Sequence, residues 1–249
     1  MSFSEFSALA VSEESEAKAR VTDAALKLFS AQGFPNVSVR DIMNACGLTA
    51  GALYAHYKSK EELLFKLIMN GHLRLQSRLE AMYHLPGTPP VRLARLCFVQ
   101  SLFQLHNLEL ARVSTSEFRY LPDAFKQELN VVRTKMTTYF DDTLQQGVDK
   151  GVFNIPRFAP VRMAIFASAN TAPQWFEPGG PMSAEEVAKT HADTTLRIVM
   201  TTNAGANRIQ ALVLDSLIEL QGGWEAVLAK LDKGEAASAE AGKPADGQG

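Results

Sequence analysis

Apolar side chains recur at helical spacing along most of this chain. Near the N-terminus, Ala24, Leu28 and Phe29 follow that spacing and would bury a first helix against the two helices that come next. No stretch of any length alternates strictly between apolar and polar residues, as a half-buried strand would. The pattern therefore predicts an all-α protein.

Two short helices separated by a tight turn are predicted between residues 38 and 56. Ser38 is an N-cap candidate for the first of them, and Asp41, three residues later, completes a capping box. Ile42 supplies apolar surface on the same helix. Gly47 permits the tight turn, because a residue without a Cβ adopts backbone conformations that other residues avoid.

The second of these helices begins with unusually small side chains. Thr49 is its N-cap candidate, and Ala50 and Gly51 follow at the first helical positions. Small residues there allow the helix backbone to come very close to another surface. In a helix-turn-helix unit, that surface is the major groove of DNA, whose base edges meet the start of the second helix.

A longer helix is predicted to begin at Lys60, where Ser59 and Glu62 form a further capping box. Free N–H groups, the positive end of the helix dipole and the lysine itself would favour a DNA phosphate at this point. Local charge agrees with that reading. Residues 18–60 contain six basic and two acidic side chains, although the whole chain carries a net charge of only −2.

The remaining sequence predicts a second, larger helical unit. Leu67 and Leu75 continue the helix that starts at Lys60, and the proline-rich stretch at residues 84–90 is the clearest loop. Further helices are predicted at residues 91–107, 108–118, 122–150, 157–171 and 183–200.

Residues 20–66 resemble the DNA-binding domain of the TetR/AcrR family of bacterial transcriptional regulators. The matching segments, in order, are residues 23–29, 33–34, 38–42, 47–54, 56–57 and 59–63. The resemblance implies an N-terminal three-helix helix-turn-helix domain followed by a larger helical ligand-binding and dimerisation domain. It also implies double-stranded operator DNA as a partner, and neither enzymatic activity nor a cofactor.

This resemblance divides the chain into five parts. They are a flexible N-terminal arm (1–15), the helix-turn-helix domain (16–64), the ligand-binding and dimerisation domain (65–203), a C-terminal helical extension (204–232) and a disordered tail (233–249). The tail consists mostly of Gly, Ala, Ser, Glu and Pro, which cannot bury enough surface to become ordered. We expect a homodimer formed through the helices at 157–171 and 183–201, with Phe158, Ile165, Val187 and Leu196 among their apolar residues.

The expected DNA contacts fall into two groups. Base readout is assigned to the start of the recognition helix, and phosphate contacts to its end and to the neighbouring helix starts. The expected residues are Thr49, Ala50 and Gly51 for bases, Ser38, Tyr54, His56 and Lys60 for phosphates, and Arg40 for either. Many relatives carry a lysine in place of Ala50, so one backbone contact is expected to be missing here.

Ten of the fourteen phenylalanines lie between residues 65 and 176, which favours an apolar ligand cavity in the second domain. The expected ligand-binding residues are Phe98, Leu102, His106, Phe118, Arg119, Arg133, Phe140 and Trp175. Ordinary core packing explains most of the phenylalanines equally well, and Trp175 suits a dimer interface equally well.

Residues 117–121, 147–153 and 175–186 also resemble TetR-family regulators of fatty-acid and sterol catabolism, which respond to acyl-CoA thioesters. Such a ligand needs a long apolar slot and a cationic mouth for its phosphates. Arg112, Arg119, Arg133 and Arg162 offer cations in this half of the chain. The resemblance therefore implies a small apolar ligand of the acyl-CoA type.

Composition narrows the setting of the protein. Two cysteines, Cys46 and Cys97, form no disulfide framework and suit a reducing cytosol. The N-terminus lacks the pattern of a signal peptide, and no run of about 18 apolar residues predicts a membrane span. We therefore expect a cytoplasmic protein without a membrane partner.

Three function classes are compatible with parts of this sequence. The leading one is a ligand-released DNA-binding repressor, whose ligand is either an acyl-CoA or a non-CoA aromatic or drug-like compound. An enzyme is disfavoured, since the sequence holds no metal-spaced Cys/His/Asp cluster, no Gly-rich phosphate loop and no G-x-S-x-G motif. A helical ligand-binding protein without DNA-binding activity is the third. The operator sequence and the direction of regulation stay open.

Overall fold

The computed structural model describes residues 3–201, with side chains from residue 16 onward except at position 50. The helical extension expected at 204–232 and the tail expected at 233–249 lie outside the described residues. Within residues 3–201, no strand occurs, and one isolated antiparallel bridge joins Phe153 to Met200. The prediction of an all-α fold is confirmed.

The described helices follow one another with short connections. In chain order they are α1 (Phe3–Gln32), the 3-10 helix η1 (Phe34–Asn36), α2 (Val39–Ala45), α3 (Ala50–His56), α4 (Lys60–His84), α5 (Pro89–His106), α6 (Leu108–Ser116), the 3-10 helix η2 (Phe118–Tyr120), α7 (Asp123–Asp149), α8 (Phe158–Trp175) and α9 (Ala184–Val199).

The backbone of residues 3–15 is helical, where the sequence led us to expect a flexible arm. These residues form the first half of α1. The segment is rich in Ser, Glu and Ala and contains neither Gly nor Pro. No residue there interrupts a helix, so α1 extends well before the apolar pattern that identified it.

Helix α8 extends slightly beyond the prediction, which gave residues 157–171 with an end near Pro173. It runs through Pro173 to Trp175. A proline this close to a helix end removes only one backbone hydrogen bond. The carbonyl of Pro173 is also satisfied from outside the helix, since it accepts a hydrogen bond from Arg112 Nε at 2.8 Å.

Two hydrophobic cores organise the helices. The first is formed by α1, α2, α3 and the start of α4, and it also includes Val113, Leu121 and Leu129 from the α6–α7 region. The second lies among the rest of α4 and helices α5, α7, α8 and α9, with Phe98 and Phe140 completely buried. The N-terminal unit therefore completes its core with residues from the second helical unit.

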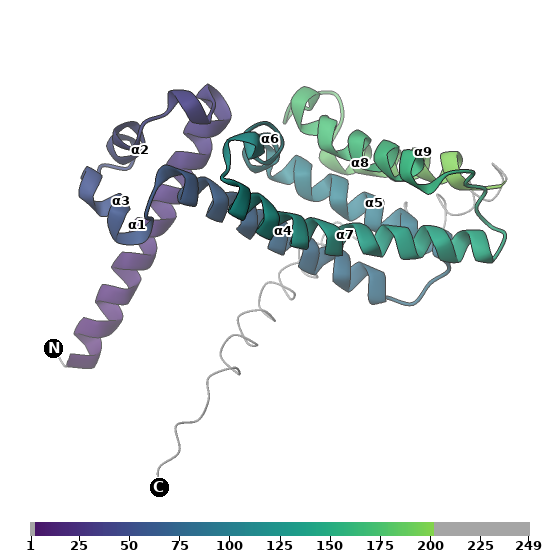
Figure 1. Cartoon of the computed structure of the whole chain (residues 1–249), viewed down its shortest axis with the longest axis horizontal. Coiled ribbons are helices and arrows are strands. Elements are labelled where there is room, and N and C mark those ends of the chain that lie inside the picture. Colours follow the sequence, from purple (N-terminus) through teal and green to yellow (C-terminus); the bar gives the residue numbers. More distant parts are fainter. Residues whose placement is uncertain (1–2, 202–249) are drawn as a thin grey trace, which may run out of the picture.

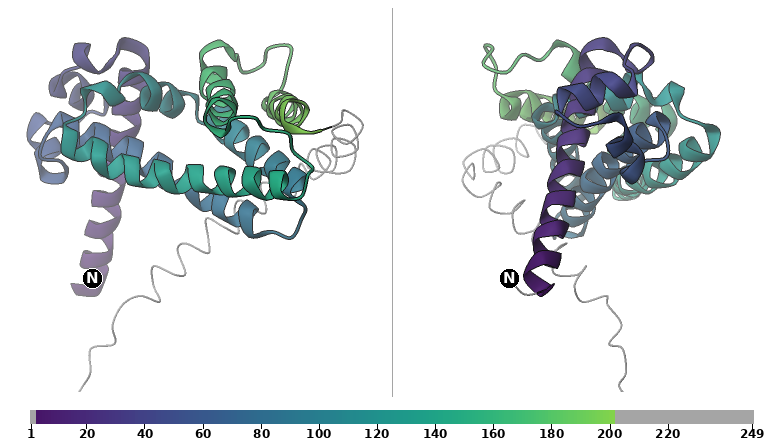
Figure 2. Two further views of the ribbon diagram at one scale, coloured as in Figure 1. Left: turned by 45° about the vertical axis from the view of Figure 1, so that its right-hand side comes forward. Right: turned by 90° about the vertical axis from the view of Figure 1, so that its left-hand side faces the viewer.

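The two cores lie at opposite ends of an elongated molecule. Figure 1 shows α1, α2 and α3 at one end, and α4 running from them into the second helical unit. The left view of Figure 2 keeps this arrangement, and α7 packs along α4. Helix α5 is the centre of the second unit, because it packs against α4, α7, α8 and α9.

Candidate DNA-binding and ligand-binding sites

The turn between α2 and α3 has the geometry that the sequence predicted. The Ser38 hydroxyl accepts a hydrogen bond from the Asp41 N–H at 3.2 Å, and the Asp41 carboxylate accepts from the Ser38 N–H at 2.8 Å. This capping box lowers the pKa of Asp41 through its hydrogen bonds with Ser38. Gly47 closes the turn with a positive φ of 66°, which glycine adopts without strain.

Helix α3 presents a polar, open face to solvent. Tyr54 is 60% exposed, and Thr49 and Gly51 are also exposed at the start of the helix. Thr49 makes no side-chain cap hydrogen bond, so its hydroxyl is not used by the helix start. His56 is half-buried at the last position of α3, and Leu53 anchors the opposite face with no exposed surface.

The expected contacts on α2 differ in what the fold leaves available. Arg40 is exposed on α2 and lies on the same end of the molecule as α3. The Ser38 hydroxyl already donates to the Asp41 carboxylate at 2.6 Å. Because the hydroxyl proton of Ser38 is bound to Asp41, it is not available to a phosphate oxygen, and the phosphate contact that the sequence suggested is disfavoured.

Lys60 has a structural role that the sequence did not reveal. Its ammonium group donates to the carbonyl oxygens of Phe34 and Val37, at 2.8 and 2.7 Å, and lies 4.1 Å from the centroid of the Phe34 ring. These contacts hold the η1 loop against the start of α4. Because two of its three N–H donors are bound to the protein, the expected phosphate contact of Lys60 is disfavoured.

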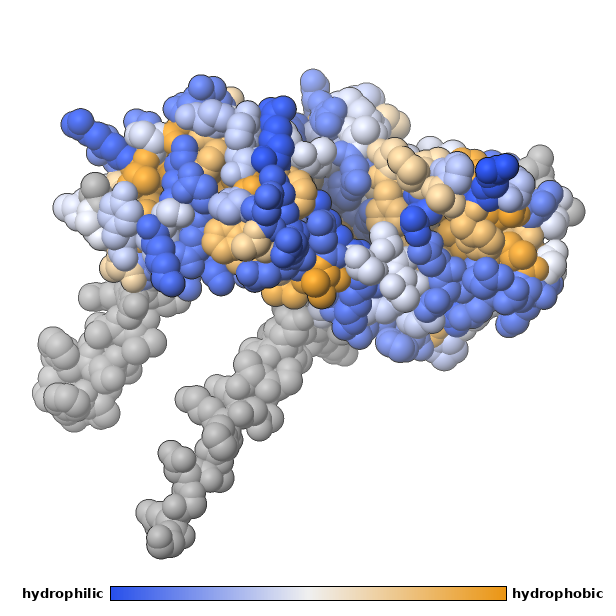
Figure 3. All heavy atoms as spheres, viewed as in Figure 1, coloured by the Kyte–Doolittle hydropathy of each residue, from blue (hydrophilic) through white to orange (hydrophobic). Residues whose placement is uncertain are grey.

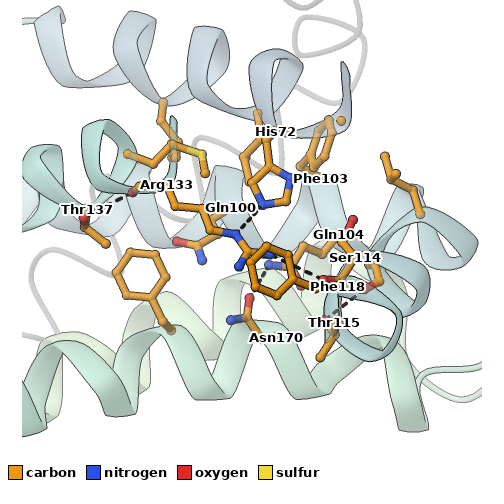
Figure 4. A pocket seen from close by; sticks show the side chains of 17 residues that line it. His72, Gln100, Phe103, Gln104, Ser114, Thr115, Phe118, Arg133, Thr137 and Asn170 are labelled. Carbon is orange, nitrogen blue, oxygen red and sulfur yellow. Dashed lines mark hydrogen bonds between the residues drawn. The ribbon is translucent and has the colours of Figure 1, made fainter. Parts of the chain in front are cut away.

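A cavity of about 420 Å³ lies between the helices of the second unit (Figure 4). This volume is in the range of sites that hold small organic ligands. Its wall is mostly apolar and carries a few polar side chains. The lining residues are Gly71, His72, Leu75, Leu79, Gln100, Phe103, Gln104, Leu110, Ala111, Ser114, Thr115, Phe118, Arg133, Met136, Thr137, Phe166 and Asn170.

Arg133 and His72 form the most polar part of this wall. Arg133 Nε donates to His72 Nε2 at 3.0 Å, and the guanidinium lies 4.0 Å from the centroid of the Phe118 ring, as Figure 4 shows. Burial, together with the nearby positive charge of Arg133, lowers the pKa of His72 to about 4. At neutral pH the imidazole is therefore uncharged, and the cavity contains a cation.

A second, smaller cavity of about 260 Å³ shares Phe103 with the first. Arg74 and Arg78 lie over the Phe103 ring, 5.8 and 5.1 Å from its centroid. His106 also lines this cavity and is within 3.3 Å of the Glu185 carboxylate. The two cavities thus adjoin at Phe103, with Arg133 in the larger one and Arg74 and Arg78 in the smaller one.

Two models of one family match most of the described chain. One, described as "Bacterial regulatory proteins, tetR family", matches residues 21–67, and the other, "Tetracyclin repressor-like, C-terminal domain", matches residues 86–199. This chain belongs to the tetR family of bacterial regulatory proteins. The first match covers α2, α3 and the start of α4, which are the helices that the sequence assigned to DNA binding.

Three relatives of this tetR-family chain each share less than a third of their aligned residues with it. The HTH-type transcriptional repressor KstR2 of Mycolicibacterium smegmatis is 28% identical over 176 residues, which are 66% of this chain and 82% of the relative. The structure of the ketosteroid transcriptional regulator KstR2 of Mycobacterium tuberculosis matches with a TM-score of 0.69 at 22% identity, over 74% of this chain and 95% of the other. The structure of AibR in complex with isovaleryl coenzyme A and operator DNA has a TM-score of 0.64 at 19% identity, over 72% and 97%.

The structure distributes the expected ligand residues of this tetR-family chain over several places. Phe118 and Arg133 line the larger cavity, and Leu102 and His106 line the smaller one. The other four expected residues line neither cavity. Phe98 and Phe140 are buried in the second core, Arg119 lies over the Tyr120 ring at the exposed end of η2, and Trp175 is 53% exposed at the end of α8.

Sequence reasoning missed most of the cavity wall. Gln100, Gln104 and Asn170 are polar residues within helices, and residue type alone does not separate them from a solvated face. A partial signal existed at Gln100 and Gln104, since they lie in the largely apolar stretch of α5 at residues 96–105. Gln104 is used in the wall itself, donating to the Asn170 side chain at 2.8 Å.

The described residues offer neither a membrane span nor a cluster of metal ligands. Among the described residues, no helix is both long and apolar enough to span a membrane. No group of three or more His, Cys, Asp or Glu side chains comes together as a metal site within the same part of the chain. Cys97 is completely buried, which raises the pKa of its thiol to about 12.

Replacement of Lys60 by Ala tests its structural role. Two backbone carbonyls lose a charged donor, so we expect the free energy of unfolding to fall by about 1–3 kcal/mol and the melting temperature by several degrees. Thermal melting followed by circular dichroism measures this, with Lys58→Ala as the control, because the Lys58 side chain is exposed. An unchanged melting temperature together with weaker, less salt-dependent DNA binding would restore the phosphate contact instead.

Proposed function

We propose that this chain is a ligand-released transcriptional repressor that binds operator DNA as a homodimer. Membership of the tetR family and the repressor KstR2 among its relatives support this proposal. The observation that carries it is the joint presence of an open helix-turn-helix face and a ligand-sized cavity in one chain. An enzyme or a ligand-binding protein without DNA binding would need only the cavity.

The exposed face of α3 supports the DNA-binding part of the proposal. The Thr49 hydroxyl makes no capping hydrogen bond, and the backbone at Gly51 faces open space. Both residues lie at the start of the helix, where base edges are read. Tyr54 and Arg40 offer exposed donors for phosphates or bases on the same end of the molecule. Ala50 and His56 remain proposed contacts, at the first and last positions of α3.

The exposed face of α8 supports a homodimer. Met163 is 69% exposed, and Ala167, Thr171 and Trp175 follow it at four-residue intervals, all exposed. Figure 3 shows apolar surface over the region of α8 and α9. A continuous stripe of small and apolar side chains suits a self-complementary interface around a twofold axis.

The apolar residues that first suggested this interface have another use. Ile165 on α8 and Val187 and Leu196 on α9 are buried in the second core, where α9 packs on α5. His191 is buried with them, and its ring lies 3.0 Å from the Ser101 hydroxyl. The proposed interface therefore uses the opposite, exposed faces of the two helices.

The pair of adjoining cavities supports a ligand of the acyl-CoA type. The larger cavity suits an apolar acyl group, and Arg74 and Arg78 beside the smaller cavity offer cations for phosphates. AibR, which has the same fold, binds isovaleryl coenzyme A and operator DNA. KstR2 is described as a ketosteroid transcriptional regulator, which favours a bulky apolar acyl group here.

The segment after α6 offers a route from ligand to DNA. Phe118 lies between Arg133 and the first core. Its neighbour Glu117 is buried and accepts a hydrogen bond from the Phe34 N–H at 3.0 Å. Phe34 in turn is held by Lys60 at the start of α4. A ligand that displaces Phe118 would therefore move the loop that precedes α2.

Release by thioesters is the first prediction from this proposal. Octanoyl-CoA and longer acyl-CoAs should lower the affinity for DNA flanking the protein's own gene by roughly 5- to 150-fold, as for a coupling of about 1–3 kcal/mol. Arg74→Met should raise the thioester concentration needed for half-release, since one cation at the phosphate end is lost. Fluorescence anisotropy of labelled DNA measures both effects, with Lys150→Met as the matched surface control.

If an uncharged aromatic or drug-like compound releases the DNA and no thioester does, the ligand is not an acyl-CoA. The proposal of a ligand-released regulator would still hold. Failure to bind any DNA from that region, with the cavity still binding thioesters, would favour a ligand-binding protein without DNA binding.

The dimer prediction is tested by Ala167→Glu, which places two like charges at the centre of the proposed interface. We expect a monomer by light scattering at micromolar concentration, and loss of specific DNA binding, because two recognition helices must span half-sites roughly 34–36 Å apart. Ala124→Glu, an identical change at an exposed alanine on α7, should leave the dimer intact. A wild-type protein that is itself monomeric would contradict the proposal directly.

A further inference from the structure

Arg133 carries a positive charge inside the larger cavity that no described residue neutralises. Its contacts are with His72, with the Ser114 carbonyl and with the face of Phe118, none of which is an anion. Burial lowers the pKa of Arg133, and no neighbouring carboxylate opposes this effect. A cation partly removed from water without a counter-ion is unfavourable, so binding of an anion there regains free energy.

The surrounding residues fix the orientation of the guanidinium. Nε donates to His72 Nε2 at 3.0 Å, Nη2 points toward the Ser114 carbonyl at a long 3.5 Å, and Phe118 covers one face. The remaining Nη hydrogens meet no acceptor among residues 16–201. Two parallel N–H groups on a held guanidinium match the two oxygens of a carboxylate.

His72 sets this geometry without compensating the charge. Its Nδ1 lies 2.9 Å from the Ile68 carbonyl and therefore carries the ring proton, which leaves Nε2 to accept from Arg133. A protonated ring could not accept that hydrogen bond, and the low pKa of His72, about 4, agrees with a neutral ring. At neutral pH the pair therefore carries one positive charge, on Arg133, and His72 holds that guanidinium in place.

A second residue of the cavity wall, Gln100, also lacks a partner for a polar atom. Gln100 is only 2% exposed, and its Oε1 is buried on the cavity wall without a hydrogen-bond partner. A buried carbonyl oxygen without a donor costs free energy. A polar group in the ligand would therefore satisfy both this oxygen and the Arg133 cation, inside a cavity whose wall is mostly apolar.

We propose that the cavity selects ligands that carry a carboxylate, bound by Arg133 in a bidentate pair. The inference rests on the proposed function in one respect, namely that the cavity is the ligand site. The carboxylate has two possible sources. It is either the head group of a free carboxylic acid or the distal carboxylate of a dicarboxylic acyl thioester whose phosphates lie outside, near Arg74.

Four probes distinguish these sources when titrated calorimetrically into the full chain at neutral pH. They are octanoic acid, its neutral counterpart octanamide, octanoyl-CoA and the monothioester octanedioyl-CoA. We expect at least one carboxylate probe to bind roughly 10- to 100-fold more tightly than its neutral-ended counterpart, as a charged hydrogen-bonded pair provides. Arg133→Met should abolish this preference. Arg133→Lys keeps the charge but loses the two parallel N–H groups, so it should keep part of the preference.

Lys135→Met is the matched control, because Lys135 lies on the same helix and pairs with Glu80 on the surface. It should keep the full preference. Equal affinities within both probe pairs, a preference that survives in Arg133→Met, or no binding of either carboxylate probe would overturn the inference.

The outcomes also separate this inference from the proposed function. If octanoyl-CoA binds and releases DNA as well as octanedioyl-CoA does, and octanoic acid binds no more tightly than octanamide, the carboxylate site is wrong and the thioester function stands. If octanoic acid is preferred over octanamide while no thioester binds, the carboxylate site stands and the thioester function fails.

Discussion

A buried hydrogen bond from the Phe34 N–H to the Glu117 carboxylate ties the loop before α2 to the segment after α6. It spans 83 residues of sequence and lies beside the first core, in which Phe34 is buried and against which Phe118 packs. Tyr120 stacks on the Phe34 ring from the same segment, with centroids 5.8 Å apart. If this contact did not form, a backbone N–H would be buried without a partner, and the loop before α2 would lose its support.

The position of this contact gives the cavity a connection to the recognition helix. Phe118 belongs to the cavity wall, and the residue before it holds the loop that leads to the Ser38 cap of α2. Ligand and DNA can influence each other only if both prefer particular arrangements of such an element. The 3-10 turn η2 is well suited to this, since it is short and contributes to both sides.

Local rules explain why much of the fold could be predicted. The caps at Ser38, Ser59 and Ser183 each start a helix, because a hydroxyl that accepts an N–H three residues later is a property of neighbouring residues. One detail at Ser59 differs, since the Glu62 carboxylate accepts from the Lys58 N–H rather than completing the box. Gly47 was predictable for the same reason, as its positive φ follows from the turn alone.

Contacts between distant segments explain what the sequence could not predict. Lys60 is a typical phosphate-binding lysine by position, and only the folded chain brings it to two carbonyls 23 and 26 residues away. The pairing of His72 with Arg133 spans 61 residues, so a histidine that looked like an ordinary helix residue became part of the cavity wall. Phe98 and Phe140 were expected in the ligand site, and both are buried in the second core. A phenylalanine pattern does not distinguish a cavity wall from a core.

The most direct test of this account is the reciprocity of the two sites. Acyl-CoA affinity should be measured by calorimetry with and without saturating DNA, in the wild type, Glu117→Gln and Glu117→Ala. We predict that DNA weakens ligand binding to the wild type by the same factor by which ligand weakens DNA binding. Gln, which still accepts from Phe34, should keep the factor, and Ala should bring it close to one while ligand binding to the free protein persists. An unchanged factor in Glu117→Ala would contradict the proposed route, and a factor of one in the wild type would contradict ligand release itself.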